Sequence, residues 1–199
     1  MENFERENFK LNGIGKFNGG DYYDVVVNGV GTLNGDLTCV NLTINGSFTS
    51  KGEIKVEDKI DINGASKFMK NVKCNRLEMD GMATFLECLE VENAVINGFL
   101  TVEKELCVGN IEINSASFSI RELHADKVFI NDLHKIRALN SLYEIGEIEC
   151  TEIEANSLKC KKISANKVKL GKNANVELVE YVEVVDIDPR ANVKEVRKI

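Results

Sequence analysis

Histidine and cysteine are the residue types in this chain most able to bind a metal ion or to act as a nucleophile. The two histidines, His124 and His134, are ten residues apart and fall at different phases of the repeat described below, with no carboxylate or thiol expected at a ligand spacing. No C-x-x-C pair occurs, so neither a zinc motif nor a thioredoxin-like motif is present. The six cysteines are Cys39, Cys74, Cys88, Cys107, Cys150 and Cys160. The sequence therefore predicts reduced thiols, no catalytic residue, no metal ligand and no cofactor.

Glycine-rich loops and exposed serines offer two further kinds of chemistry, phosphate binding and acyl transfer. Gly15, Gly19 and Gly20 are expected in turns rather than in a strand-to-helix loop that would hold a phosphate. No serine stands in a nucleophile elbow. The elements that carry these residues are therefore a better guide to function than the residues themselves.

A turn-forming dipeptide, most often Asn-Gly, recurs along the chain at steps of 16 to 18 residues. Its second residues are Gly13, Gly29, Gly46, Gly64, Gly81, Gly98, Ser115 and Asp132. Its first residues include the column Asn28, Asn45, Asn63, Asp80, Asn97, Asn114 and Asn131. A unit this short cannot enclose a core alone, so each copy must stack on its neighbours. We predict a structural turn ladder in which each following glycine takes a positive φ; anion binding by the asparagines is the alternative.

Apolar residues two positions apart mark two strands in every copy, each with one face inward. Leu42 and Ile44 belong to the first strand, and Ile54 and Val56 follow twelve and fourteen residues into that copy. A looser position suits a third strand with large side chains, namely Leu33, Phe48, Phe68, Phe85, Leu100 and Phe118. Strands of successive copies would pair at about 4.8 Å. We predict an all-β fold, a parallel β-helix with triangular coils of about 17 residues.

The repeat changes toward the C-terminus. From residue 148 the inward positions are five residues apart, which predicts narrower coils of about 15 residues. Residues 132–147 break the pattern and are predicted to be an irregular coil, either a bulge or a short helical turn. The predicted organisation is an N-terminal tail over residues 1–8, a β-helix domain over 9–177, and a C-terminal capping or tail segment over 178–199.

Composition and charge exclude some classes of function. Apolar residues make up 43% and charged residues 29%, which is ordinary for a folded soluble protein. The net charge of −7 argues against a nucleic-acid surface, which needs clustered positive charge. No segment approaches the roughly 18 apolar residues that span a bilayer, and the first residues do not resemble a signal peptide. We expect a cytoplasmic protein that does not bind nucleic acid.

Glutamates over residues 144–154 are followed by lysines over residues 159–172. In a fifteen-residue coil these side chains would pair across neighbouring coils, each exposed pair contributing about 0 to 1 kcal/mol. The predicted pairs are Glu147 with Lys162, Glu152 with Lys167, and Glu154 with Lys169. The alternative is a basic patch for an anionic lipid or a cell-wall polymer.

The segment GVGTLNGDLTCVNLTINGSFTSKGEIKV, residues 29–56, resembles the coil pattern of bactofilins, the bacterial polymer-forming cytoskeletal proteins. The likeness follows the hydrophobic-x-hydrophobic-Asn-Gly pattern from Gly13 to Ile130, and more loosely residues 168–199. It implies a right-handed β-helix that assembles end to end without nucleotide into filaments that scaffold cell-shape or envelope machinery. The implied partners are further copies of the chain and envelope or cell-wall-associated proteins, and peripheral contact with the inner face of the cell membrane stays open.

Self-assembly is also expected from the fold alone, because an open solenoid presents unpaired strand edges at both ends unless caps cover them. The predicted end contacts are Phe9, Leu11, Ile14 and Phe17 at one end, and Val176, Leu178, Tyr181 and Val184 at the other. Two other classes remain. One is a capped β-helix that binds partners without polymerising. The other is a carbohydrate-active β-helix enzyme, which would need charged side chains clustered on one face, whereas the acidic residues are expected to be scattered along the outside.

Overall fold

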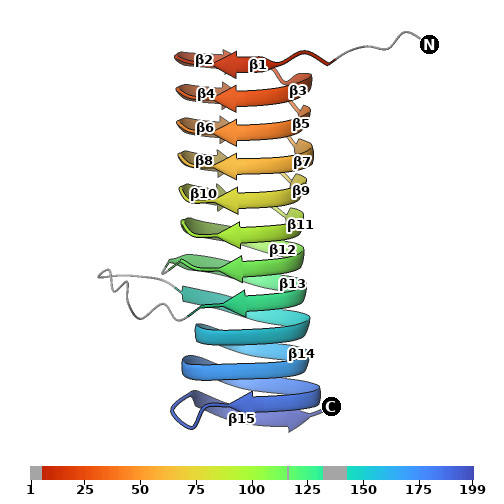
Figure 1. Ribbon diagram of the computed structural model, residues 1–199, viewed down its shortest axis with the longest axis vertical. Helices are drawn as coiled ribbons and strands as arrows, with labels where there is room; N and C mark the ends of the chain where they lie inside the picture. Colours follow the sequence, from red (N-terminus) through yellow and green to blue (C-terminus); the bar gives the residue numbers. More distant parts are fainter. Residues whose placement is uncertain (1–5, 116, 132–142) are drawn as a thin grey trace, which may run out of the picture.

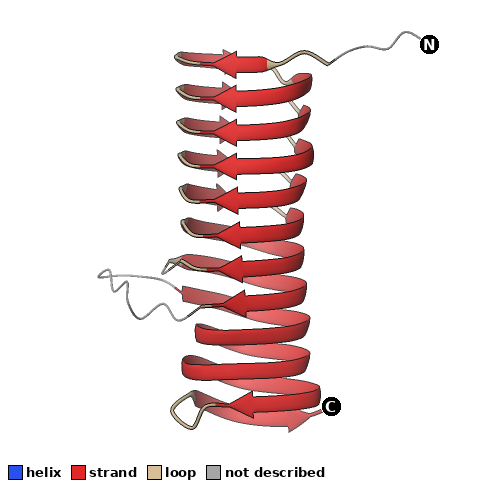
Figure 2. Ribbon diagram, viewed as in Figure 1, coloured by secondary structure: helices blue, strands red, loops and turns tan. Residues whose placement is uncertain are grey.

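The chain forms stacked coils of β-strand along a single axis (Figures 1 and 2). This computed structural model describes residues 6–115, 117–131 and 143–199, and no helix occurs among them. The fold is a parallel β-solenoid of about 10 turns with coils of about 17 residues. The prediction of an all-β parallel β-helix is therefore confirmed.

Fifteen strands build the stack. The strands of the first half are β1 (Phe9–Leu11), β2 (Ile14–Phe17), β3 (Gly20–Val27), β4 (Val30–Leu33), β5 (Leu37–Ile44), β6 (Ser47–Ser50), β7 (Ile54–Ile62) and β8 (Ala65–Phe68). Those of the second half are β9 (Val72–Met79), β10 (Met82–Phe85), β11 (Leu89–Ile96), β12 (Phe99–Ile113), β13 (Phe118–Ile130), β14 (Tyr143–Ile187) and β15 (Asn192–Lys198). From β12 onward the strands run through corners of the coil without a break, as the continuous ribbon in Figure 1 shows.

Odd-numbered and even-numbered strands of the first half form separate stacks in which every pairing is parallel. One stack runs β1-β3-β5-β7-β9-β11 and the other β2-β4-β6-β8-β10, and both end on β12. Leu42 pairs with Val25 and with Ile60, 17 and 18 residues away, so equal phases of the repeat lie directly above one another. The predicted inward positions of the odd strands are buried, with Leu42 and Ile44 both at 0% exposure.

The short even-numbered strands share the interior width between one large and one small side chain. In β6 the large Phe48 precedes Ser50, whereas in β8 the small Ser66 precedes Phe68. Phe48 pairs with Ser66 and Ser50 with Phe68, so the two rings occupy adjacent columns with centroids 5.9 Å apart. The predicted single column of large residues is therefore wrong. In these five strands a large side chain at one inward position goes with glycine, alanine or serine at the other, which accounts for the buried Ser50 and Ser66. In the following coils both positions hold large side chains, Leu100 with Val102 and Phe118 with Ile120.

Glycine is required at the Asn-Gly corner of the coils from Gly29 to Gly98 for a different reason from the one predicted. Among the glycines, all of which the structure describes, Gly19 and Gly20 alone have a positive φ, of 90° and 138°, so the left-handed conformation predicted for the glycines of the Asn-Gly column is wrong. A Cβ at Gly29, Gly46, Gly64, Gly81 or Gly98 would instead lie 1.8 to 2.0 Å from the carbonyl oxygen of the equivalent glycine one coil earlier. These five corners need glycine because neighbouring coils approach too closely there for a Cβ, whereas the later coil has Ser115 at the same phase.

Coil length varies toward the C-terminus. Within β14 the Nζ of Lys159 donates to Glu144, 15 residues earlier, at 3.1 Å, which agrees with the predicted narrowing. The last coil is wider again, since β15 pairs Asn192 with Asn175, 17 residues away. Residues 132–142, which hold His134 and most of the predicted irregular coil, lie outside the described residues. Residues 143–147 begin β14 and pair with β13.

Candidate assembly interface

The N-terminal end of the solenoid is a coil whose strands pair on one side only. Among the described residues, β1 pairs only with β3 and β2 only with β4, and both lie at the end of the stack (Figure 1). Unpaired N–H and C=O groups on such an edge can pair with another strand. Phe9 and Phe17, with ring centroids 4.6 Å apart, are partly buried against the core, whereas Ile14 is 89% exposed. This end therefore offers backbone hydrogen bonds and an apolar surface together.

Two corner residues of this coil, Asn12 and Gly13, repeat the dipeptide although no described coil lies before them. A Cβ at Gly13 would meet nothing within 4 Å, whereas one at Gly29 would lie 2.0 Å from the carbonyl oxygen of Gly13. The Nδ2 of Asn28 donates to the Oδ1 of Asn12 at 2.8 Å, but the Nδ2 of Asn12 has no acceptor among the residues that the structure describes. Both residues fit a position on which another coil stacks.

The C-terminal end is formed by β15 and by residues 182–187 of β14. β15 pairs with β14 along one edge, and the pairing ends with Tyr181 and Lys198. Four apolar side chains at this end are exposed, Val182 at 42%, Val184 at 54%, Val196 at 44% and Ile199 at 64%. The turn before β15 is held by Asp188, whose carboxylate accepts the backbone N–H of Arg190 at 2.9 Å and hydrogen bonds from its guanidinium. These bonds lower the pKa of Asp188 to about 2, so its charge is kept at any pH above that value.

The structure places the predicted contacts of the C-terminal end unequally. Val176 is 0% exposed and pairs with Val193, so it belongs to the interior and its assignment as an end contact is corrected. Leu178 and Tyr181 likewise lie one coil inside the end, beneath β15. Val184 alone of the four lies on the last coil. At the other end all four predicted contacts, Phe9, Leu11, Ile14 and Phe17, belong to the first coil.

The sequence did contain a signal for the missed end residues. The tripeptide Ala-Asn-Val at residues 174–176 returns at residues 191–193, a step of 17 that matches the upstream repeat. The second copy is strand β15, which carries Val193 and Val196. Residues 178–199 were predicted to be a cap or tail, so this last coil was not expected. Val196 and Ile199 were therefore not among the predicted contacts.

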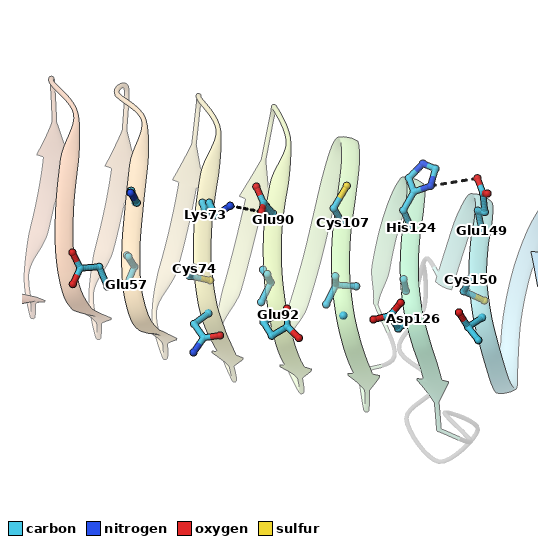
Figure 3. Close-up of a pocket in the computed structure, with 18 residues that line it drawn as sticks. Glu57, Lys73, Cys74, Glu90, Glu92, Cys107, His124, Asp126, Glu149 and Cys150 are labelled. Atoms are coloured by element: carbon cyan, nitrogen blue, oxygen red, sulfur yellow. Dashed lines mark hydrogen bonds and ion pairs between the residues drawn. The ribbon is translucent and has the colours of Figure 1, made fainter.

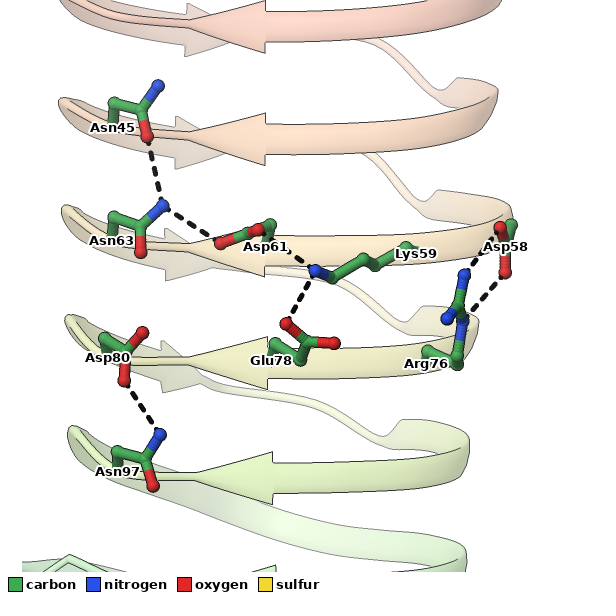
Figure 4. Close-up of polar contacts among 9 residues, drawn as sticks. All are labelled: Asn45, Asp58, Lys59, Asp61, Asn63, Arg76, Glu78, Asp80 and Asn97. Carbon is green, nitrogen blue, oxygen red and sulfur yellow. Dashed lines mark hydrogen bonds and ion pairs between the residues drawn. The ribbon is translucent and has the colours of Figure 1, made fainter.

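A hydrogen-bonded ladder of side chains runs along the Asn-Gly corner (Figure 4). The Nδ2 of one residue donates to the Oδ1 one coil earlier from Asn45 to Asn28 (2.9 Å), Asn63 to Asn45 (3.1 Å), Asn97 to Asp80 (2.8 Å) and Asn114 to Asn97 (3.0 Å), and Asn131 donates to Asn114. Asp80 interrupts the ladder, because a carboxylate has no N–H to donate to Asn63. Amide side chains that both donate and accept suit this column because every coil repeats the same contact.

Asp80→Asn is expected to complete this ladder and to stabilise the solenoid. One added hydrogen bond contributes about 0.5 to 1.5 kcal/mol, with the lower end fitting an exposed position. The measurement is the free energy of unfolding by thermal or denaturant titration. Asp36→Asn is the matched control, since it removes the same charge. In the unaltered protein the Oδ1 of Asp36 accepts the Glu53 N–H at 2.9 Å, and the Oδ1 of an asparagine there would still accept it. An equal gain in both variants would assign the effect to net charge and contradict the ladder.

A groove of about 950 Å³ crosses β7, β9 and β11 and continues over β12, β13 and β14. In Figure 3 its outward side chains stand in a row from Lys73 and Glu90 through Cys107 to His124 and Glu149. Lys73 and Glu90 form an ion pair, and the Nδ1 of His124 lies 3.6 Å from Glu149. The sequence had suggested acidic residues scattered over the outside and no carboxylate at a ligand spacing from His124, whereas the coil register places Glu105 and Glu149 beside this histidine.

Five of the six thiols, those of Cys39, Cys74, Cys107, Cys150 and Cys160, are unsuited to nucleophilic chemistry near neutral pH. All six cysteines are free. Burial raises the pKa of Cys39, Cys74, Cys150 and Cys160 to about 12. Partial burial and a hydrogen bond to Glu105 raise the pKa of Cys107 to about 11. Because the thiolate is the reactive form, these side chains act as small apolar or weakly polar groups.

The lysines of the C-terminal coils are engaged by glutamates. The observed pairs are Lys169 with Glu154 (2.8 Å), Lys162 with Glu180 (2.9 Å) and Lys167 with Glu183 (4.0 Å). The first pair is as predicted, but Lys162 and Lys167 pair with the following coil rather than with the preceding one. The hydrogen bond between Lys162 and Glu180 raises the pKa of the lysine and lowers that of the glutamate. Lysines that already contact carboxylates weigh against the alternative of a basic patch here.

The described ranges contain neither a metal-binding cluster nor a membrane-spanning helix. No group of three or more histidine, cysteine or acidic side chains there is arranged to hold a metal ion. No helix long and apolar enough to cross a membrane occurs in those ranges either.

Stacked parallel coils, a continuous apolar interior and strand edges that no other described residue covers at either end define this chain as a β-solenoid protein. Residues 7–88 match the model of the bactofilin family, which is described as polymer-forming cytoskeletal, so the resemblance inferred from the coil pattern is confirmed for that part of the chain. The match of residues 7–88 to a polymer-forming family and the solenoid fold together support a structural scaffold.

Other comparisons add little. No curated protein matches the sequence. The C-terminal domain of a tapirin from Caldicellulosiruptor hydrothermalis, a solved structure, is similar at a TM-score of 0.37 and 13% identity, over 98% of this chain and 57% of that one. The chain thus spans a little over half the length of that structure.

Proposed function

We propose that this protein is a non-enzymatic scaffold that assembles end to end, without nucleotide, into filaments. The observation that carries the proposal is the corner of the first coil. Gly13 has open space where every equivalent glycine from Gly29 to Gly98 meets the backbone of the coil before it. A glycine at this position is needed only if a further coil stacks on the N-terminal end, and a second copy of the chain would supply it.

Both ends support this assembly. Unpaired edges of β1 and β2 at one end and of β15 at the other leave backbone groups for intermolecular strand pairing. Exposed Ile14, Val184 and Val196 add apolar area at the contact. The bactofilin match over residues 7–88 agrees with self-association. Filaments of this kind would scaffold cell-shape or envelope machinery at the inner face of the cell membrane, with envelope or cell-wall-associated proteins as partners.

Gly13→Ala is expected to fold normally and to lose filaments. The added Cβ has space within the chain, but it would strike the backbone of an incoming coil at the spacing seen between Gly29 and Gly13, 2.0 Å. Val184→Asp should weaken the opposite end by burying a charge in the contact. The measurements are negative-stain electron microscopy and sedimentation of the purified protein without nucleotide. For both variants we expect monomers or short oligomers where the unaltered protein forms filaments.

Val95→Asp is the matched control, since Val95 is 36% exposed on the side of the solenoid, away from both ends. It should leave filaments intact. If filaments persisted in both Gly13→Ala and Val184→Asp, these two ends of the solenoid would not form the contact between copies. An unaltered protein that forms only short rods would reject polymerisation and favour the capped binding scaffold.

A further inference from the structure

The groove that crosses β7, β9, β11, β12, β13 and β14 contains a hollow at β12. The outward residues of β12 that line the groove are the small Cys107 and Gly109. On both neighbouring strands the residues at the same phases are longer, since the register pairs Cys107 with Glu90 and with His124. These longer residues are Glu90 and Glu92 of β11, and His124 and Asp126 of β13. The hollow is therefore walled on two sides and floored by β12 (Figure 3).

Two carboxylates of these walls have no counter-ion. Glu92 and Asp126 are exposed, and neither forms an ion pair or a side-chain hydrogen bond with a residue that the structure describes. The side chain of Glu92 reaches over the floor, since a Cβ at Gly109 would lie 3.0 Å from its Oε1. In Figure 3 Glu92 and Asp126 lie on either side of β12. A positively charged group above Gly109 therefore has a carboxylate on each side.

Like charges also stack beside the hollow. Glu105 of β12 pairs in register with Glu122 of β13, which pairs with Glu147 of β14. Of the residues that line the groove on β11 to β14, four are acidic and none is lysine or arginine. Elsewhere on the solenoid neighbouring coils place opposite charges together, as in Lys169 with Glu154. Carboxylates on adjacent strands repel one another, and a groove lined by one sign of charge attracts ligands of the other sign.

The dimensions of the groove favour an extended peptide over a small cation. The groove crosses six strands, so at about 4.8 Å per coil it is about 24 Å long, the length of about seven extended residues. Its volume of about 950 Å³ is far more than one ion fills, and the described ranges hold no cluster arranged for a metal ion. Arginine suits the walls because its planar guanidinium forms two hydrogen bonds with a carboxylate. We propose that the groove binds an extended, arginine-rich segment of a partner protein, with one guanidinium between Glu92 and Asp126.

The test is fluorescence anisotropy of a fluorescein-labelled heptapeptide of alternating arginine and glycine, titrated with the full chain at low and physiological salt. We expect binding that weakens with salt and that is lost when glutamine replaces arginine in the peptide. The double variant Glu92→Gln with Asp126→Asn should raise the Kd about tenfold, because it removes both charges that face the guanidinium. Cys107→Phe, which fills the hollow and keeps the charge, should also weaken binding; if it bound as tightly as the unaltered protein, the hollow would not be the site. Thermal unfolding checks that each variant is folded.

The double variant Glu112→Gln with Glu152→Gln is the matched control, since it removes the same charge from exposed residues that line a different hollow. It should bind the peptide like the unaltered protein. Absence of binding, or an equal loss in this control, overturns the inference. Spermine that binds as tightly as the peptide, with the same dependence on the two carboxylates, would assign the groove to a small polycation and also overturn it. The inference does not rest on polymerisation, and Gly13→Ala, which blocks end contacts, should still bind the peptide.

Discussion

Replacing Gly98 with alanine is expected to disrupt the stacking of the central coils, with a loss of unfolding free energy of about 4 kcal/mol or more. The new Cβ would lie 1.8 Å from the carbonyl oxygen of Gly81. That oxygen accepts the N–H of Phe99 at 2.8 Å, so the coils cannot separate without losing a ladder hydrogen bond. The measurement is cooperative unfolding followed by circular dichroism.

Gly13→Ala is the control for Gly98→Ala because it places the same side chain at the same phase of the repeat. Nothing lies within 4 Å of a Cβ at Gly13, so its stability should match that of the unaltered protein. If both variants lost stability equally, the loss would come from the change in residue type and not from coil contact. A stable Gly98→Ala protein would show that the corner can widen.

The length of the coil and the position of each residue within it could be predicted, because similar residues recur a fixed distance apart in the sequence. Leu42, Ile60 and Leu77 lie at the same phase of the repeat, and stacking then dictates that they pair. The reason for glycine at the corner could not be seen in the same way. It depends on a contact between residues such as Gly98 and Gly81 in different coils, whereas the sequence alone suggested a local requirement on φ.

The site was less predictable than the fold. The first coil was found from Phe9, Leu11 and Phe17, because the repeat begins there. The last coil was missed because Pro189 and the basic residues after it resemble a tail. Contacts across the groove, such as the 3.5 Å between His124 Nε2 and Glu105, depend on which outward positions become neighbours once the coils stack. Spacing within one copy does not contain that information.

Phe68→Ala is expected to destabilise the solenoid by about 3 to 5 kcal/mol, the usual result of emptying the space of a buried aromatic ring. Phe68 is 0% exposed and stacks on Phe85, with centroids 4.6 Å apart and an interplanar angle of 5°. Its neighbour Ser66 is too small to fill the cavity. The measurement is the free energy of unfolding, and Phe99→Ala, which truncates an outward ring that is 54% exposed, should cost far less.

The alternation of large and small residues also implies a rescue. Since β6 carries its ring at the first inward position, as Phe48, and β8 at the second, a coil accommodates the ring at either position. The double variant Ser66→Phe with Phe68→Ser keeps the interior volume of the coil and should recover part of the stability that Phe68→Ala loses. If it were no more stable than Phe68→Ala, the stack of Phe68 on Phe85 would matter more than volume, and the shared-width account of the interior would be wrong.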